Sequence, residues 1–253
     1  MRFFLKLFGE ESALGRFLNR LYVIVVSNLL FVLFSVPVVT IGAAFTAMDY
    51  TLMKYQRGDR HFKVAAMFWK GFRENFRKST LCFIALVALF LFQVLEISWC
   101  NQFTGPMALF RYVLAGLMVL EVICAMYLFP VIAAFNGSVG ELLKDTLYFA
   151  FSKPHWMLLC LLLHAGPLTV TYLFLQYLPL WAFLWMMFGF AAISYVSAKI
   201  MLRQFLPFLP EVDICGDMIP PGLENDPNIM VGDHSSGEDP DEKTLQEMMK
   251  FGL

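Results

Sequence analysis

Residues 154–198 read PHWMLLCLLLHAGPLTVTYLFLQYLPLWAFLWMMFGFAAISYVSA, and this stretch decides the fold class. It runs for 45 residues without an Asp, Glu, Lys or Arg. A helix that crosses a hydrocarbon core about 30 Å thick needs about 20 apolar residues. The stretch is therefore long enough for two crossings, and the polar, proline-bearing segment Gln176–Pro179 is predicted as the turn between them.

The composition of the whole chain agrees with this interpretation. Of 253 residues, 59% are hydrophobic and only 15% are charged, and the mean hydropathy is +0.65. These values exclude an ordinary soluble globular protein. Two further spans are predicted at residues 79–95 and 108–135, separated by the polar loop at residues 100–106. The sequence thus predicts an all-α, polytopic transmembrane helical bundle in contact with the lipid bilayer.

The first apolar stretch, Leu21–Met48, has two interpretations. Its 28 uncharged residues would extend about 42 Å as one helix, so a single tilted span is possible. Pro37 instead favours a break, with one short helix from about residue 17 to 36 and a second from about residue 40 to 55. The sequence leaves both five and six spans open.

The distribution of Lys and Arg favours six spans. If residues 21–48 cross twice, sixteen basic residues lie on the cytoplasmic side and only Arg111 lies outside, whereas one crossing divides them twelve against five. Cytoplasmic loops collect basic residues. We therefore expect six spans with both termini in the cytoplasm.

Two cytoplasmic connectors are predicted to be amphipathic helices. The first, residues 62–78, alternates aromatic and basic side chains at helical spacing, and we expect it to lie flat on an anionic leaflet or to pack below the bundle. Its candidate contacts to lipid phosphates are Lys63, Lys70, Arg73, Arg77 and Lys78. The second opens with Ser138 and Glu141 at the spacing of a capping box and runs toward Lys153.

The charge changes sharply near Pro210, which divides the chain into predicted parts. Residues 1–20 form an amphipathic cytoplasmic N-terminus and residues 21–209 the transmembrane domain. Residues 210–253 form an acidic tail, and from residue 211 it carries a charge of −9, against +8 for the remainder. Its composition predicts disorder. The tail either docks on a partner or on the basic body, or simply increases solubility.

Ionisable residues inside a span are costly, so they mark candidate sites. Glu121 and His164 each fall near the middle of a predicted span, and Pro167 follows His164 closely. A pair between these two side chains is geometrically possible, and it would act either as structural contact between helices or as a proton or substrate site. Asp49 is interpreted as a charge satisfied locally by Lys54.

A set of short motifs lies near the N-terminus, namely Asn28-Leu29-Leu30-Phe31, Ser35-Val36-Pro37-Val38-Val39-Thr40-Ile41-Gly42-Ala43-Ala44, Lys54, Arg57-Gly58, Phe68-Trp69 and Phe72-Arg73-Glu74-Asn75-Phe76. Together these motifs resemble the YesL-like family of bacterial integral membrane proteins. The resemblance is best over residues 20–80 and continues loosely to about Pro210. It implies a cell-membrane protein of unassigned function whose relatives are commonly encoded beside carbohydrate uptake systems. It supplies no catalytic residues.

The family motif is rich in small residues, which predicts a chain break and close helix packing. Pro37 would make the break, and Gly42, Ala43, Ala44 and Ala47 would form the contact surface. No metal, cofactor or nucleic-acid site is expected. The sequence predicts a non-enzymatic accessory or interaction protein, with a transporter permease as one possible partner. The alternative is a small-molecule transporter or channel that uses Glu121 and His164.

Overall fold

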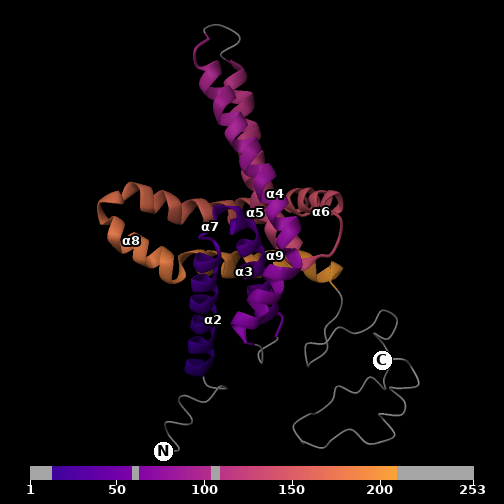
Figure 1. The fold of residues 1–253 in the computed structure, drawn as a ribbon, viewed down its shortest axis with the longest axis vertical. Coiled ribbons are helices and arrows are strands. Elements are labelled where there is room, and N and C mark those ends of the chain that lie inside the picture. Colours follow the sequence, from indigo (N-terminus) through magenta and orange to yellow (C-terminus); the bar gives the residue numbers. More distant parts are fainter. Residues whose placement is uncertain (1–12, 59–62, 104–108, 210–253) are drawn as a thin grey trace, which may run out of the picture. The chain divides into compact units, whose positions relative to one another are not determined.

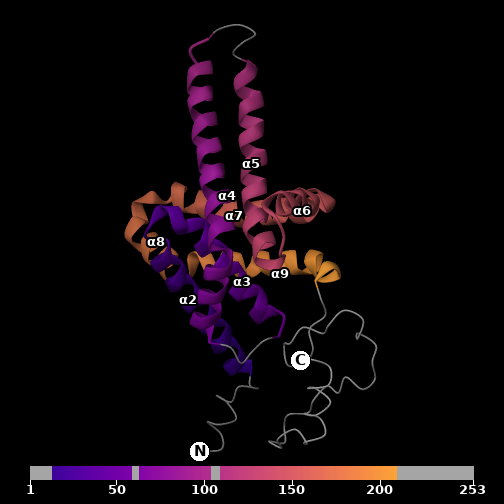
Figure 2. The same ribbon diagram turned by 45° about the vertical axis from the view of Figure 1, so that its right-hand side comes forward.

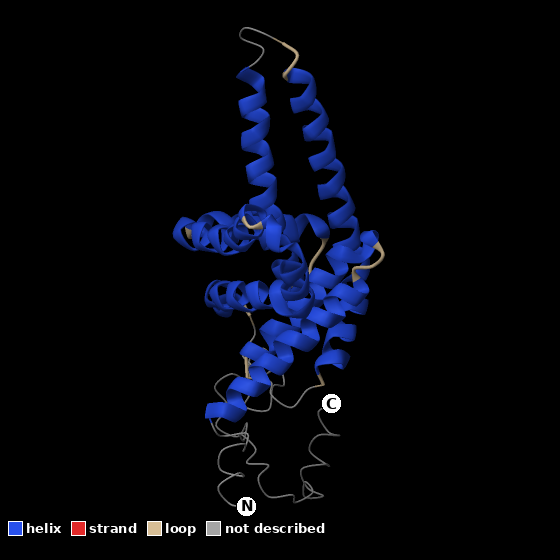
Figure 3. Ribbon diagram, turned by 90° about the vertical axis from the view of Figure 1, so that its left-hand side faces the viewer, coloured by secondary structure: helices blue, strands red, loops and turns tan. Residues whose placement is uncertain are grey.

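The computed structural model describes residues 13–58, 63–103 and 109–209, and every regular element in these ranges is a helix (Figure 3). In chain order the elements are α2 (Ala13–Phe34), η1 (Val38–Thr40), α3 (Ile41–Gln56), α4 (Val64–Cys100), α5 (Phe110–Ala134), α6 (Val139–Ser152), α7 (Pro154–Leu173), η3 (Leu175–Tyr177), α8 (Leu178–Leu184), η4 (Trp185–Gly189), α9 (Phe190–Phe205) and η5 (Leu206–Phe208). η4 is a π-helical turn. The predicted boundary at residue 20 falls inside α2. The predicted acidic tail lies outside the described residues.

Five segments of the described chain are long and apolar enough to cross a bilayer. They are Leu14–Phe34, Val64–Cys100, Phe110–Ala134, Pro154–Leu173 and Leu175–Phe208. Most of their large apolar side chains are exposed, as expected for helices that contact lipid. The prediction of an all-α, polytopic membrane protein is confirmed.

The first apolar stretch is broken, as Pro37 predicted. α2 ends at Phe34, and the hydroxyl of Thr40 donates to the carbonyl oxygens of Phe34 and Pro37 across the break. α3 then starts at Ile41 and has 16 residues, about 24 Å of helix. It is shorter than the five candidate spans of the described chain. The structure therefore has five helical segments long enough to cross a bilayer in these residues, and not the preferred six.

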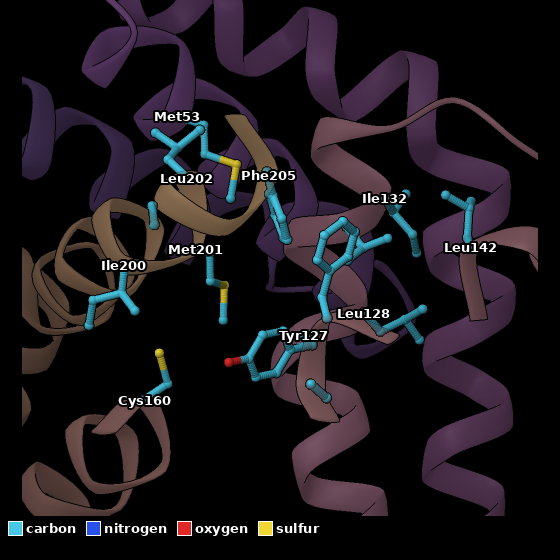
Figure 4. Close-up of a cluster of buried hydrophobic side chains, with 14 of the residues drawn as sticks. Met53, Tyr127, Leu128, Ile132, Leu142, Cys160, Ile200, Met201, Leu202 and Phe205 are labelled. Carbon is cyan, nitrogen blue, oxygen red and sulfur yellow. The ribbon is translucent and has the colours of Figure 1, made fainter. Parts of the chain in front are cut away.

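α3 instead forms the centre of the described structure. It contacts α2, α4, α5 and α9, and ten of its side chains or backbone positions are buried. One apolar cluster joins α3 to α2 and to the start of α4, and it includes Phe31, Met48 and Phe68. A second cluster joins α5, α6, α7 and α9, and Figure 4 shows the Tyr127 hydroxyl pointing toward Cys160 within it.

α4 and α5 form an antiparallel hairpin whose far ends extend away from the other helices (Figures 1 and 2). α4 is one uninterrupted helix of 37 residues. The connector helix predicted over residues 62–78 is present from residue 64 and is continuous with the predicted span, so the two form one element. Nothing between Lys78 and Ser79 stops the helical hydrogen bonding, since neither residue is a helix breaker.

The other connector and the last hairpin follow their predictions more closely. α6 begins at Val139, and Ser138 and Glu141 form the predicted capping box. α7 and α9 are joined through η3 and α8, so the predicted turn at residues 176–179 is present. The π-helical turn η4 within the second leg was not predicted. This hairpin runs across the direction of the α4–α5 hairpin (Figures 1 and 3).

Candidate functional site

A cavity of about 380 Å³ lies where α3, α5, α7, η4 and α9 meet. Its walls are mostly apolar, and volumes of this order are typical of small-molecule sites. The polar residues that line it are Asp49, His164, Ser194 and Ser197. The cavity therefore combines a mostly apolar surface with a few polar side chains.

Asp49 is the acidic residue among the described residues that line the cavity. It lies in the middle of α3, and only 6% of it is exposed. The hydroxyl of Ser194 on α9 donates a short hydrogen bond to Asp49 Oδ1. Ser197 in turn donates to the carbonyl oxygen of Ser194, 3.1 Å away. The carboxylate is thus fixed by a helix 145 residues later in the chain, and not by Lys54 as the sequence suggested.

His164 reaches the cavity from α7. Its Nδ1 lies 2.8 Å from the carbonyl oxygen of Cys160, one turn earlier on the same helix. Because a carbonyl oxygen only accepts, this nitrogen carries the proton, and a neutral ring suffices for the contact. Pro167 follows three residues later in the same helix, which continues to Leu173.

Aromatic side chains form a large part of the cavity wall. Phe45 and Phe129 stack with ring centroids 6.1 Å apart, and Trp185 lies 4.9 Å from Phe190. Phe31 connects the two pairs, at 4.5 Å from Phe45. The indole nitrogen of Trp185 donates to the Thr171 hydroxyl at 3.1 Å, which fixes the ring. The cavity wall therefore contains packed aromatic side chains, of which Trp185 is also held by a hydrogen bond.

Asn28 of α2 holds the irregular backbone beside the cavity. Its side-chain nitrogen donates to the carbonyl oxygens of Trp185 and Met186, at 3.0 and 2.7 Å. Its side-chain oxygen accepts from the backbone N–H of Ala191 at 2.9 Å. A π-helical turn disturbs the regular hydrogen-bonding pattern, and in a membrane such groups need protein partners. Asn28 belongs to the motif that carries the family resemblance, and this contact gives it a physical role.

The predicted close-packing residues of α3 are buried. Ala43, Ala44 and Ala47 are fully buried, and Gly42 lies directly against α4. A Cβ added to Gly42 would be 2.5 Å from the Cβ of Phe83 and 2.7 Å from the carbonyl oxygen of Ser79. Thr46 and Ser79 share a hydrogen bond of 2.8 Å across the same contact. The small residues allow the two backbones to approach closely.

The predicted pair of Glu121 and His164 does not form. Glu121 lies on α5 and is 7% exposed, but it does not line the cavity. Neither of its carboxylate oxygens has a hydrogen-bond partner within the described ranges. Gln93, which is buried on α4 of the same hairpin, also has an unpaired side-chain oxygen there. The sequence located two mid-span polar residues correctly but not their partners, because the rotation of each helix was unknown.

The predicted lipid-phosphate residues lie along the first half of α4. The side chains of Lys63, Lys70, Arg73 and Arg77 are exposed, and that of Lys78 is partly exposed. Their exposure leaves them available to anionic groups. Lys78 also contributes to the environment of Glu141 at the start of α6, together with Lys144.

The capping box shifts the titration of Glu141. The backbone N–H of Ser138 donates to Glu141 Oε2 at 2.7 Å, and the Glu141 backbone N–H donates to the Ser138 hydroxyl at 3.4 Å. Hydrogen bonding from Ser138, aided by the two nearby lysines, lowers the pKa of Glu141 below its ordinary value. Residue spacing alone was enough to predict this contact.

Asp49 and Ser194 are the site residues that sequence reasoning missed. Asp49 was noted as an ionisable residue in an apolar stretch, and that was the available signal. Nothing in the sequence connects it with Ser194. Within residues 13–58, 63–103 and 109–209, no three His, Cys, Asp or Glu side chains gather closely enough to hold a metal ion.

Comparisons with known proteins agree with the resemblance seen in the sequence. Residues 24–97 match the model of a family described as "Protein of unknown function, DUF624". The chain is 26% identical over 181 residues to the uncharacterized protein YesL of Bacillus subtilis (strain 168), and the alignment covers 70% of this chain and 82% of that relative. No solved structure matches the chain. The chain is therefore a membrane protein that is similar to YesL, and its residues 24–97 resemble a family whose function is unknown.

Proposed function

We propose that this chain is a non-enzymatic membrane protein that binds a small molecule in the cavity between α3, α5, α7 and α9, as a transporter or channel does. The observation that carries the proposal is the position of Asp49, a buried carboxylate on the wall of a mostly apolar cavity. An ionisable side chain within the membrane is costly and is a functional candidate by default. In this proposal His164 remains a residue of the polar site, as the sequence predicted, and Asp49 takes the role that the sequence prediction gave to Glu121.

The backbone around the cavity supports the same proposal. Trp185 lines the cavity and also begins the π-helical turn η4. π-Helical turns occur frequently at functional sites, and broken or irregular helices line the sites of many transporters. Asn28 keeps this turn in place through three hydrogen bonds. An irregular helical segment therefore forms part of the cavity wall.

Thermal unfolding of the purified full chain in a neutral detergent tests this function. The probes are three sets of small molecules, namely neutral sugars, organic anions and organic cations. We expect at least one set to raise the melting temperature of the native chain and to lose this effect in Ala125→Trp, whose larger side chain fills the cavity. Equal stabilisation of both chains, or none of the native chain, would contradict a ligand site in the cavity.

A second function, that of an accessory protein, is favoured by the surface of α7. In this helix only Cys160 is buried, so an apolar face is left for lipid or for a partner helix. We propose that this partner is a transporter permease of a carbohydrate uptake system, in keeping with the family resemblance. Leu162→Trp on α7 should weaken co-purification of a permease subunit, whereas Leu95→Trp on α4 should not. Both leucines are 68% exposed, so they are matched controls.

We further propose that the chain resides in the bacterial cytoplasmic membrane with both termini inside, which requires the short helix α3 to return the chain across the bilayer after α2. The distribution of basic residues supports this orientation, since Lys and Arg gather on cytoplasmic segments. Single cysteines at Glu10 and Gly105, placed in a chain without other cysteines, can be labelled in intact cells. We expect label at residue 105 only, and label at residue 10 would overturn the orientation.

A further inference from the structure

We propose that the cavity binds organic cations with an apolar or aromatic body. This inference rests on the proposed function, because it names the ligand class of the same site. Three observations carry it: the buried carboxyl group of Asp49, the aromatic side chains of the wall, and the small number of polar groups that remain free in the cavity.

The charge of the cavity favours a cation. Asp49 is only 6% exposed. Within the described residues, its carboxylate accepts one hydrogen bond, from the hydroxyl of Ser194. No lysine or arginine is among the described residues that line the cavity. A buried carboxylate without a countercharge is costly, and a bound cation offsets that cost, whereas an anion would increase it. Neutral His164 adds no charge.

The aromatic wall favours the same ligand class. Phe45, Phe129, Trp185 and Phe190 line the cavity, and their ring faces attract a cation through the ring quadrupole. Trp gives the strongest such contact, and Trp185 is held by its hydrogen bond to Thr171. The same rings provide apolar contact area for the body of the ligand. A small hydrated metal ion would not use that area.

The polar groups of the cavity disfavour a sugar. The hydroxyl of Ser194 already donates to Asp49, and that of Ser197 already donates to the Ser194 carbonyl. The Nδ1 of His164 is also engaged, by the Cys160 carbonyl. A sugar brings several hydroxyl groups that each need a partner when buried, and leaving them unpaired is costly. Carbohydrate is therefore a poor ligand for this cavity.

Tetraphenylphosphonium and tetraphenylborate test the proposal, because they carry the same four phenyl groups with opposite charge. Binding to the purified full chain in neutral detergent is measured by equilibrium dialysis. We expect saturable binding of the phosphonium and none of the borate. Asp49→Asn should weaken phosphonium binding by about tenfold or more, since it removes the countercharge and keeps the size of the side chain.

Two further variants separate the possible failures. Glu121→Gln removes a buried carboxylate outside the cavity and should leave phosphonium binding unchanged. Ala125→Trp fills the cavity without altering Asp49 and should abolish binding, which keeps the test valid if Asp49→Asn does not fold. Borate binding that Ala125→Trp abolishes would overturn the cation class while leaving the cavity as a ligand site. Phosphonium binding unaffected by Asp49→Asn, or no phosphonium binding at all, would also overturn the inference.

Discussion

The side-chain oxygen of Asn28 lies 2.9 Å from the backbone nitrogen of Ala191 and accepts its hydrogen bond across 163 residues of sequence. The same side chain donates to two carbonyl oxygens of the π-helical turn η4. Asn28 thereby connects the first described helix to the irregular segment of the last hairpin. This contact keeps the wall of the cavity in its observed form.

Replacing Asn28 should destabilise the protein. Asn28→Ala removes three hydrogen bonds and leaves buried backbone groups unpaired, so we expect a loss of roughly 2–4 kcal/mol in the free energy of unfolding. Asn28→Asp should be no better, because a carboxylate cannot donate to the two carbonyl oxygens. Unfolding by denaturing detergent measures both. Leu29→Ala, at an exposed neighbour, is the control, and equal losses in Asn28→Ala and Leu29→Ala would contradict the role of the amide.

Gly42 should not tolerate even one added methyl group. Gly42→Ala would place a Cβ 2.5 Å from that of Phe83, so α3 and α4 must separate. We expect a loss of about 1–3 kcal/mol in the free energy of unfolding from overpacking. Gly116→Ala on α5 is the matched control, because nothing lies within 4 Å of its added Cβ. That variant should be neutral or more stable by about 1 kcal/mol. A neutral Gly42→Ala would show that the contact is looser than described.

Removing the carboxylate of Glu121 should not destabilise the hairpin. Within the described chain its oxygens have no hydrogen-bond partner, so Glu121→Leu exchanges an unpaired buried polar group for an apolar one. We expect an unchanged or higher melting temperature in detergent. A marked decrease would reveal a partner for Glu121 and would restore it as a site residue.

The capping box of α6 should give a pH-dependent stability. Folding lowers the pKa of Glu141, so its carboxylate stabilises the folded state above the ordinary carboxyl pKa. This stabilisation is lost as the pH falls through the lowered pKa. The difference in melting temperature between the native chain and Glu141→Gln should therefore shrink as the pH is lowered below the pKa of an ordinary glutamate side chain. A difference that does not change with pH would contradict it.

Ser138 should matter through the same capping box. Ser138→Ala removes the side-chain acceptor of the Glu141 N–H, and loss of such a cap costs about 1 kcal/mol. Circular dichroism near neutral pH should show that the helix content of Ser138→Ala is lost at a lower temperature than that of the native chain during thermal unfolding. Ser138→Asp keeps an acceptor at this position and should restore most of the stability.

Features that depend on neighbouring residues were predictable from the sequence. The apolar runs predicted the long helices, Pro37 predicted the break before α3, and the Ser138–Glu141 spacing predicted the start of α6. The small residues around Gly42 predicted close packing, although not that α4 is the helix they contact. The helix predicted over residues 62–78 is present from residue 64 as the start of α4, but amphipathic spacing does not reveal that no break separates it from the following span.

The sequence by itself determined which segments are helical and that they belong in a membrane, because helical hydrogen bonds join residues four apart and lipid contact follows from apolar composition. Only the tertiary structure decided that Asp49 meets Ser194, that Asn28 meets Ala191, and that Glu121 has no such partner in the described residues. The reason is physical. Lipid and the protein interior are similarly apolar, so an apolar helix carries little information about its rotation or its neighbours. Those choices are made by a few small and polar side chains whose partners lie far away in the chain.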